Sequence, residues 1–171
     1  MSAGEATGAM DATPDAGPPE IRLSLPSRLD YLEIIDKVID GVADQMEFDG
    51  DQKDEIAISV LEACTNSIQH AHNHDPSLAV EVVFHVLPDR LEVTVQDHGT
   101  GFDVDLVEDA GAPENLLKAR GRGIFIMRSV MDEVRFDFSG PGTLCTLVKI
   151  KRGPTSDQDE APPRAGLDDP A

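Results

Sequence analysis

The sequence predicts an α+β fold, a two-layer sandwich of helices on a sheet. Apolar residues recur at helical spacing through two long segments near the start of the chain. They then alternate at the two-residue spacing of strands, with one more helical segment between the strands. Helices first and strands afterwards are typical of an α+β domain.

The first half of the domain is predicted to hold one strand and two helices. Residues 21–25 alternate like a strand that ends at Pro26, and Ser27 is placed to cap the helix that follows. The apolar stripe of this first helix runs to about Met46 and consists of Leu29, Leu32, Ile35, Ile39 and Val42. After a loop at 49–51, a second helix is predicted over 52–72, until Asp75 and Pro76 stop it. Its buried stripe is predicted to be Ile56, Val60, Ala63, Ser67 and Ala71.

The second half is predicted to contain four strands and one main helix. The expected segments, in chain order, are strands 80–87 and 91–96, a polar loop 98–112, a helical piece 114–119, a helix 123–131, a strand 134–138, a turn 139–142 and a strand 143–150. Residues 1–20 and 153–171 are rich in Pro, Gly and small residues, so we expect disordered tails around one domain at 21–152.

Charge and hydropathy exclude several classes of function. The net charge is −19, and residues 21–150 alone hold 24 acids against 11 bases, so a nucleic-acid-binding surface is not expected. No apolar stretch reaches the roughly 18–20 residues of a membrane span, and no secretory signal is visible. We therefore expect a soluble, cytoplasmic protein, with Cys64 and Cys145 as buried, reduced thiols.

The second helix carries a polar column of Glu62, Asn66 and His70. Residues four apart lie nearly above one another on a helix, so the three side chains share one face. A carboxylate there can accept a proton, and an amide oxygen suits Mg²⁺ as a ligand. A simple solvated polar face remains the alternative.

Two glycine-containing segments follow. Asp97-His-Gly99-Thr-Gly101-Phe-Asp103 comes directly after a strand, where a carboxylate can accept a hydrogen bond from an amine such as that of adenine. Its glycines allow the backbone to approach a ligand, although Asp and Gly are also ordinary turn residues. The second segment, Gly121-Arg122-Gly123, is predicted to be a turn that opens a helix, whose free N–H groups attract anions.

Positive charge gathers beside the second glycine segment. Lys118, Arg120 and Arg122 fall within five residues, and the stretch between Arg90 and Lys118 has no Lys or Arg. This cluster is the expected counter-charge for phosphates. Neither a P-loop nor a dinucleotide-binding fingerprint is present.

In this order, the three motifs resemble those of the GHKL ATPases, the superfamily of gyrase, histidine kinases and heat-shock chaperones. Within that group the chain looks most like the bacterial anti-sigma-factor serine/threonine kinases. The similarity lies in Glu62 to Ala71 (N-box), Asp97 to Asp103 (G1 box), Gly121 to Met127 (G2 box), Gly142-Thr143 before the last strand, and the opening Leu25 to Leu32. It covers about residues 21–150 and implies the Bergerat fold, with a mixed, mostly antiparallel sheet.

The resemblance implies a role for each motif residue. Glu62 would be the general base, and Asn66 would ligate the Mg²⁺ that bridges the phosphates of ATP. Asp97 and Thr143 would hold adenine. The remaining expected nucleotide-binding residues are His70, Gly99, Gly101, Arg120, Gly121, Arg122, Gly123 and Ile124.

The resemblance also implies partners. The protein would phosphorylate a STAS-domain anti-anti-sigma protein, would act on a sigma factor in another state, and would form a homodimer. A nucleotide-gated binding module without phosphoryl transfer is the alternative. The catalytic half of a histidine kinase is set aside, because no histidine precedes Glu62.

The run His70-Ala-His72-Asn-His74-Asp75 raises a further alternative, a Zn²⁺ site. Residues two apart on a helix point to different faces, so we favour one histidine of the motif beside two exposed ones.

Overall fold

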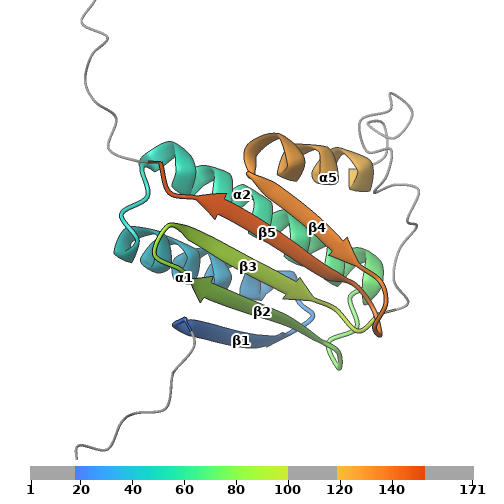
Figure 1. Ribbon diagram of the computed structural model, residues 1–171. Coiled ribbons are helices and arrows are strands. Elements are labelled where there is room, and N and C mark those ends of the chain that lie inside the picture. Colours follow the sequence, from blue (N-terminus) through green and yellow to red (C-terminus); the bar gives the residue numbers. More distant parts are fainter. Residues whose placement is uncertain (1–17, 100–118, 153–171) are drawn as a thin grey trace, which may run out of the picture.

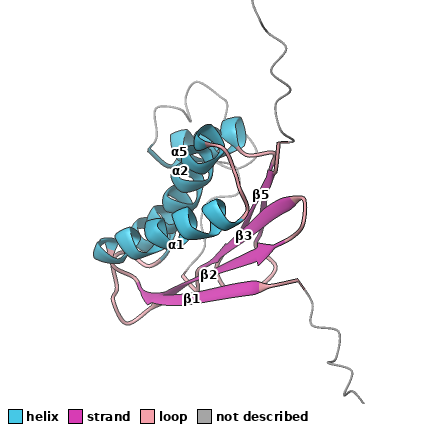
Figure 2. Cartoon of the chain, turned by 90° about the vertical axis from the view of Figure 1, so that its left-hand side faces the viewer, coloured by secondary structure: helices cyan, strands magenta, loops and turns pink. Residues whose placement is uncertain are grey.

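The computed structural model describes residues 18–99 and 119–152 (Figure 1). Most of the two predicted tails lies outside the described residues, as does most of the polar loop with its short helical piece. The described part is a layer of helices on one face of a sheet, as Figure 2 shows from the side. The predicted α+β sandwich is therefore confirmed.

Five strands form the sheet. They are β1 (Glu20–Pro26), β2 (Ala79–Val86), β3 (Arg90–Gln96), β4 (Glu133–Asp137) and β5 (Leu144–Ile150). Their order is β1-β2-β3-β5-β4, and all neighbouring strands within the described residues pair antiparallel. The sheet is thus antiparallel in this part of the chain, and the parallel pairing that a mixed sheet implies is not found there.

Within the described residues, three α-helices cover one face of this sheet. They are α1 (Leu32–Gln45), α2 (Gly50–Asn66) and α5 (Ala119–Val130). The predicted apolar stripe of α2 is buried throughout, from Ile56 and Val60 at 0 % exposure to Ala71 at 9 %. It packs on the alternating residues Leu91, Val93 and Val95 of β3, which are also buried. The apolar side chains at helical spacing in α2 and those at strand spacing in β3 therefore pack together in one aliphatic core.

Both helix starts in the first half differ from the prediction. Ser27 does not cap α1: Arg28 is extended, a short 3₁₀ turn (Leu29–Tyr31) comes first, and the Ser27 side chain is fully buried instead. Asp49, expected in a loop, caps α2 by accepting a hydrogen bond from the Gln52 N–H at 2.8 Å. The helix accordingly begins at Gly50, two residues before the predicted start.

The second helix also ends differently. The α-helical part stops at Asn66 and continues as a π-helical turn, Ser67–Ala71. The His72 N–H donates to the Ser67 carbonyl five residues back, at 2.9 Å. The wider turn leaves both Ala71 and His72 buried. The expectation of two exposed histidines is therefore wrong for His72, although His74 is exposed.

Helix α5 starts at Ala119 and not at the predicted residue 123. Gly121 and Gly123 consequently lie within its first turns, and the expected glycine turn before the helix is wrong. At the other end, the buried Lys149 of β5 donates to the Val130 carbonyl at 2.6 Å and pairs with Glu55 of α2 at 2.5 Å. These contacts fix α5 against α2 and the sheet.

Candidate nucleotide site

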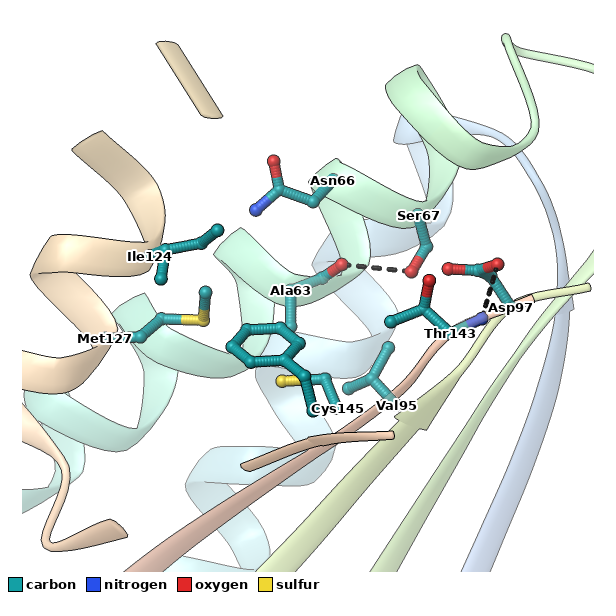
Figure 3. A pocket seen from close by; sticks show the side chains of 10 residues that line it. Ala63, Asn66, Ser67, Val95, Asp97, Ile124, Met127, Thr143 and Cys145 are labelled. Atoms are coloured by element: carbon teal, nitrogen blue, oxygen red, sulfur yellow. Dashed lines mark hydrogen bonds between the residues drawn. The ribbon is translucent and has the colours of Figure 1, made fainter. Parts of the chain in front are cut away.

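Two adjoining pockets lie where the C-terminal half of α2 faces α5 and the ends of β3 and β5. The first is lined by Ala63, Asn66, Ser67, Val95, Asp97, Ile124, Met127, Phe136, Thr143 and Cys145 (Figure 3). The second is lined by Glu62, Thr65, Asn66, Gln69, His70, Arg122, Gly123 and Ile126. Asn66 lines both, which places the two pockets side by side.

Asp97 gives the first pocket its buried charge, being only 2 % exposed. Its Oδ1 accepts hydrogen bonds from the N–H groups of Gly99 and Thr143, both at 3.1 Å. The Asp97 N–H in turn donates to the Thr143 carbonyl at 3.0 Å. Among the described residues, hydrogen bonds reach this carboxylate only at Oδ1. Oδ2 can therefore accept a hydrogen bond from a ligand.

Thr143 carries an unsatisfied hydroxyl. Its Oγ1 is buried and has no hydrogen-bond partner within the described part of the chain. Buried polar atoms nearly always have a partner, and leaving one without costs about 1–3 kcal/mol. In Figure 3 the hydroxyl lies close to Ser67 and Asp97, and the apolar Val95 and Ile124 line the same pocket. A flat ring that carries an amine and a ring nitrogen satisfies both polar groups, which is the chemistry of adenine.

Two glycines bring the backbone close to Asp97. Gly142 has φ +78°, and a Cβ on it would lie 2.6 Å from Asp97 Oδ1 and closer still to the Asp97 carbonyl oxygen. A Cβ on Gly99 would collide with the Ala71 carbonyl. Larger residues at either position would displace the turn that holds the carboxylate. Gly142 was not predicted as a site residue, although its place before Thr143 was a signal.

The second pocket contains Glu62 and Asn66. The Asn66 Nδ2 donates to Glu62 Oε1 at 3.5 Å, which leaves the amide oxygen free of that carboxylate and available to a cation. Burial raises the pKa of Glu62, while the Asn66 hydrogen bond and the charge of Arg122 lower it in part. A carboxylate with a raised pKa is a stronger base at neutral pH than an exposed one.

Gly123 lies directly against Glu62. A Cβ on Gly123 would overlap Glu62 Oε1 and lie 2.6 Å from its Cδ. The small residue in α5 therefore leaves the volume that the carboxyl group occupies. This contact explains why a glycine is needed at position 123 although the residue lies in a helix and not in the predicted turn.

Most of the predicted site residues that the structure describes come together in these pockets. Glu62, Asn66, His70, Arg122 and Gly123 meet in the second pocket, and Asn66, Asp97, Ile124 and Thr143 in the first. Gly101 lies outside the described residues, and the side-chain surroundings of Arg120 and Gly121 are not described. Sequence reasoning missed the apolar walls, above all Val95, Met127 and Cys145, whose only signal was the periodicity of the core.

The Zn²⁺ alternative finds no support. The described residues contain no group of three His, Cys, Asp or Glu side chains that could hold a metal ion. Cys64 and Cys145 are both free and buried, as predicted, and burial raises the pKa of Cys64 to about 12. None of the described helices is long and apolar enough to cross a membrane.

Comparison with known proteins agrees with this geometry. The protein-family model of the histidine kinase-like ATPase domain matches residues 25–149 of the sequence, a range that includes the residues of both pockets. The chain belongs to this family. As a member of this GHKL-type ATPase family it uses ATP.

Relatives specify the branch of the family. Serine-protein kinase RsbW of Bacillus subtilis (strain 168) is 34% identical over 145 residues, which are 81% of this chain and 90% of that protein. The protein of the same name from Bacillus licheniformis is 35% identical over 136 residues, 76% of this chain and 84% of the relative. The GHKL-type ATPase domain described here is accordingly an enzyme of the serine/threonine-protein kinase class.

Proposed function

We propose that the protein is a Mg²⁺- and ATP-dependent serine/threonine kinase of a bacterial partner-switching system, and an anti-sigma factor that phosphorylates a STAS-domain anti-anti-sigma protein. The observation that carries the proposal is the position of Asn66 between the two pockets. The buried Asp97 lies on one side of it and the Glu62 carboxyl group on the other.

In this proposal the first pocket holds adenine. Asp97 Oδ2 accepts a hydrogen bond from the exocyclic amine, and Thr143 Oγ1 donates to a ring nitrogen. Ile124 packs against the base. Gly99 shapes the turn that orients Asp97, and Gly101 would contribute to nucleotide binding as the second glycine of the same sequence motif.

The second pocket would receive the phosphates. The Asn66 amide oxygen would ligate Mg²⁺, and the direction of its Nδ2 towards Glu62 is consistent with this role. Arg122 would supply positive charge, together with the N–H groups of the first turn of α5, where Gly121 lies. Arg120 is a further proposed contact from the sequence alone. His70 lines the same pocket and offers a further polar contact.

Bound Mg·ATP supplies the phosphoryl group for transfer to a protein hydroxyl. Glu62 removes the proton of that hydroxyl as its oxygen bonds to the γ-phosphorus, and the bond to ADP breaks on the far side. Gly123 keeps α5 close to Glu62 without displacing it, and Asn66 orients the carboxylate. Positioning and charge neutralisation provide most of the catalysis.

The partner assignments rest on likeness to the proteins named Serine-protein kinase RsbW. A STAS-domain protein would present the serine or threonine, a sigma factor would bind in the alternative state, and two copies of the chain would form the working dimer. The cytoplasm would be the site of this exchange. No basic nucleic-acid surface is needed for it, in line with the net charge of −19.

The pH dependence of phosphoryl transfer tests the role of Glu62. A base works only when deprotonated, and burial raises the pKa of Glu62. The rate of phosphoryl transfer is therefore highest at high pH. It falls as the pH drops through a midpoint that lies above the usual glutamate pKa of about 4.3. Single-turnover rates measured between about pH 4 and about pH 8 would show the midpoint.

Arg122→Ala provides the control for this pH profile. Because the Arg122 charge lowers the pKa of Glu62, its removal moves the midpoint upward, whatever it does to the maximal rate. A profile that is flat down to the ordinary glutamate range, or a midpoint that does not respond to Arg122→Ala, contradicts the assignment.

Thr143→Val tests the adenine pocket. Valine has nearly the shape of threonine but lacks the unsatisfied hydroxyl, so the free protein gains about 1 kcal/mol in its free energy of unfolding. ATP loses one hydrogen bond, and its dissociation constant rises about tenfold. Urea unfolding and calorimetric titration measure the two effects. A less stable variant, or unchanged ATP affinity, argues against this role of Thr143.

The competing function is a nucleotide-gated module that captures a partner without transferring phosphate. The presence of Glu62 beside Asn66 favours the kinase, since a pure binding module needs no base there. A pull-down with and without Mg·ATP, with γ-phosphate labelling of the captured protein, separates the two. Phosphate on the partner and its release support the kinase, while capture without labelling supports the module.

A further inference from the structure

His72 is a buried polar residue with no role in the proposed chemistry. It follows the π-helical turn Ser67–Ala71 and is 3 % exposed. Its ring lies between two segments that are distant in the sequence. Nδ1 is 3.1 Å from the Ser27 hydroxyl, 45 residues away, and Nε2 is 3.1 Å from the backbone nitrogen of His98, 26 residues away.

These contacts determine where the ring carries its proton. The His98 N–H can only donate, so Nε2 accepts and bears no hydrogen. Nδ1 then carries the proton and donates it to Ser27 Oγ. Burial lowers the pKa of His72, opposed by the charges of Asp97 and Asp75 and reinforced by His98, which favours the neutral ring.

The anchor of the ring is itself fixed. Ser27 is fully buried, and its N–H donates to the Leu78 carbonyl at 2.9 Å. The Nδ1 side of His72 is thereby held at the connection between β1 and α1. The Nε2 side is left to hold the segment after β3, because the ring has little freedom to turn.

That segment is the turn that carries Asp97. The end of the π-helical turn and the residue after it hold this segment at two points: Gly99 lies against the Ala71 carbonyl, and the His98 N–H donates to His72. Between these points the Gly99 N–H donates to Asp97 Oδ1. A shift of the peptide that joins Asp97 to His98 would therefore rotate the carboxylate in the first pocket.

We infer that His72 is a positioning residue of the nucleotide site: its Nε2 fixes the turn after β3 and so aims the Asp97 carboxylate at the base. This inference rests on the proposed function, in which Asp97 recognises adenine. It assigns the effect of His72 on nucleotide binding to Nε2 alone. The hydrogen bond from Nδ1 to Ser27 serves the stability of the fold and has little direct effect on the nucleotide.

Two substitutions separate the ring nitrogens. In His72→Gln the side-chain oxygen reaches the place of Nε2 and still accepts from the His98 N–H. In His72→Asn the shorter amide reaches only the place of Nδ1, so it keeps the bond to Ser27 and loses the bond to His98. Each variant keeps one hydrogen bond and loses the other, which makes them matched controls.

The full-length variants are titrated with Mg·ATP and with Mg·GTP by calorimetry. His72→Asn is expected to weaken ATP binding about tenfold and to narrow the preference for ATP over GTP, whereas His72→Gln stays within about threefold of the unchanged protein. Equal binding by both variants, equal loss in both, or loss in His72→Gln alone overturns the inference. An unchanged protein that does not bind Mg·ATP at all overturns the proposed function instead, and the role of His72 with it.

A measurement on the unchanged protein does not depend on whether the variants fold. Nitrogen NMR of the His72 ring distinguishes a proton on Nδ1 from a proton on Nε2. The structure requires the proton on Nδ1 at neutral pH. A ring protonated on Nε2, or on both nitrogens, contradicts the hydrogen bond from His98 and overturns the inference.

Discussion

Glu62→Gln is expected to reduce phosphoryl transfer by about 10²- to 10⁴-fold, the usual contribution of a general base. The glutamine has nearly the same shape and can still hydrogen-bond with Asn66, but it cannot take up the proton of the attacking hydroxyl. ATP affinity should stay within about threefold, because the loss falls on the transition state and not on binding. Single-turnover transfer and calorimetric titration of Mg·ATP measure the two quantities.

Glu33→Gln is the matched control for this substitution. Glu33 is an exposed helical glutamate that pairs with Lys37 on the surface of α1, so its replacement alters the same charge far from the pockets. Its transfer rate should equal that of the unchanged protein. Equal rates for Glu62→Gln and Glu33→Gln would remove Glu62 from the mechanism.

Gly123→Ala is expected to have the second-largest effect. The new Cβ overlaps the end of the Glu62 side chain, which is flexible and can rotate away. A base moved by about 1 Å costs on the order of 10²-fold in rate. Alanine also favours the helix by about 1 kcal/mol, so the strain and the propensity largely offset each other and the protein remains folded. Transfer rates and thermal unfolding check the two expectations.

Gly41→Ala isolates the effect of helix propensity. Gly41 is exposed in α1, and a Cβ there meets nothing within 4 Å. The free energy of unfolding should rise by up to about 1 kcal/mol without any change in the rate of phosphoryl transfer.

A double variant tests whether Gly123 acts through Glu62. The protein with both Gly123→Ala and Glu62→Gln should transfer phosphate no more slowly than Glu62→Gln alone, because both substitutions act on the same carboxyl group. Additive losses would mean that Gly123 acts elsewhere.

The helices, the strands and the site motifs could be predicted because their signals are local. The stripe from Ile56 to Ala71 predicted the buried face of α2, and the alternation of Leu91, Val93 and Val95 predicted the buried face of β3. The polar column on α2 likewise placed Glu62 and Asn66 together, since residues four apart share a face whatever the rest of the fold does.

What the sequence could not predict depends on contacts across the fold. His72 looked like one of two exposed histidines, but the π-helical turn buries it, and its partners lie 45 and 26 residues away. Gly123 looked like part of a turn, but it lies within helix α5, where a Cβ would overlap the Glu62 carboxyl group. Neither the turn geometry nor the steric contact leaves a periodic signal in the chain.

The most direct test of the central claim is labelling with Mg·[γ-³²P]ATP in the presence of a purified STAS-domain protein from the same organism, followed by identification of the labelled residue. The proposed function predicts stable label on a serine or threonine of the partner, and none when the kinase carries Glu62→Gln. If the protein binds Mg·ATP and captures the partner yet leaves it unlabelled, the kinase assignment is contradicted and the nucleotide-gated module takes its place.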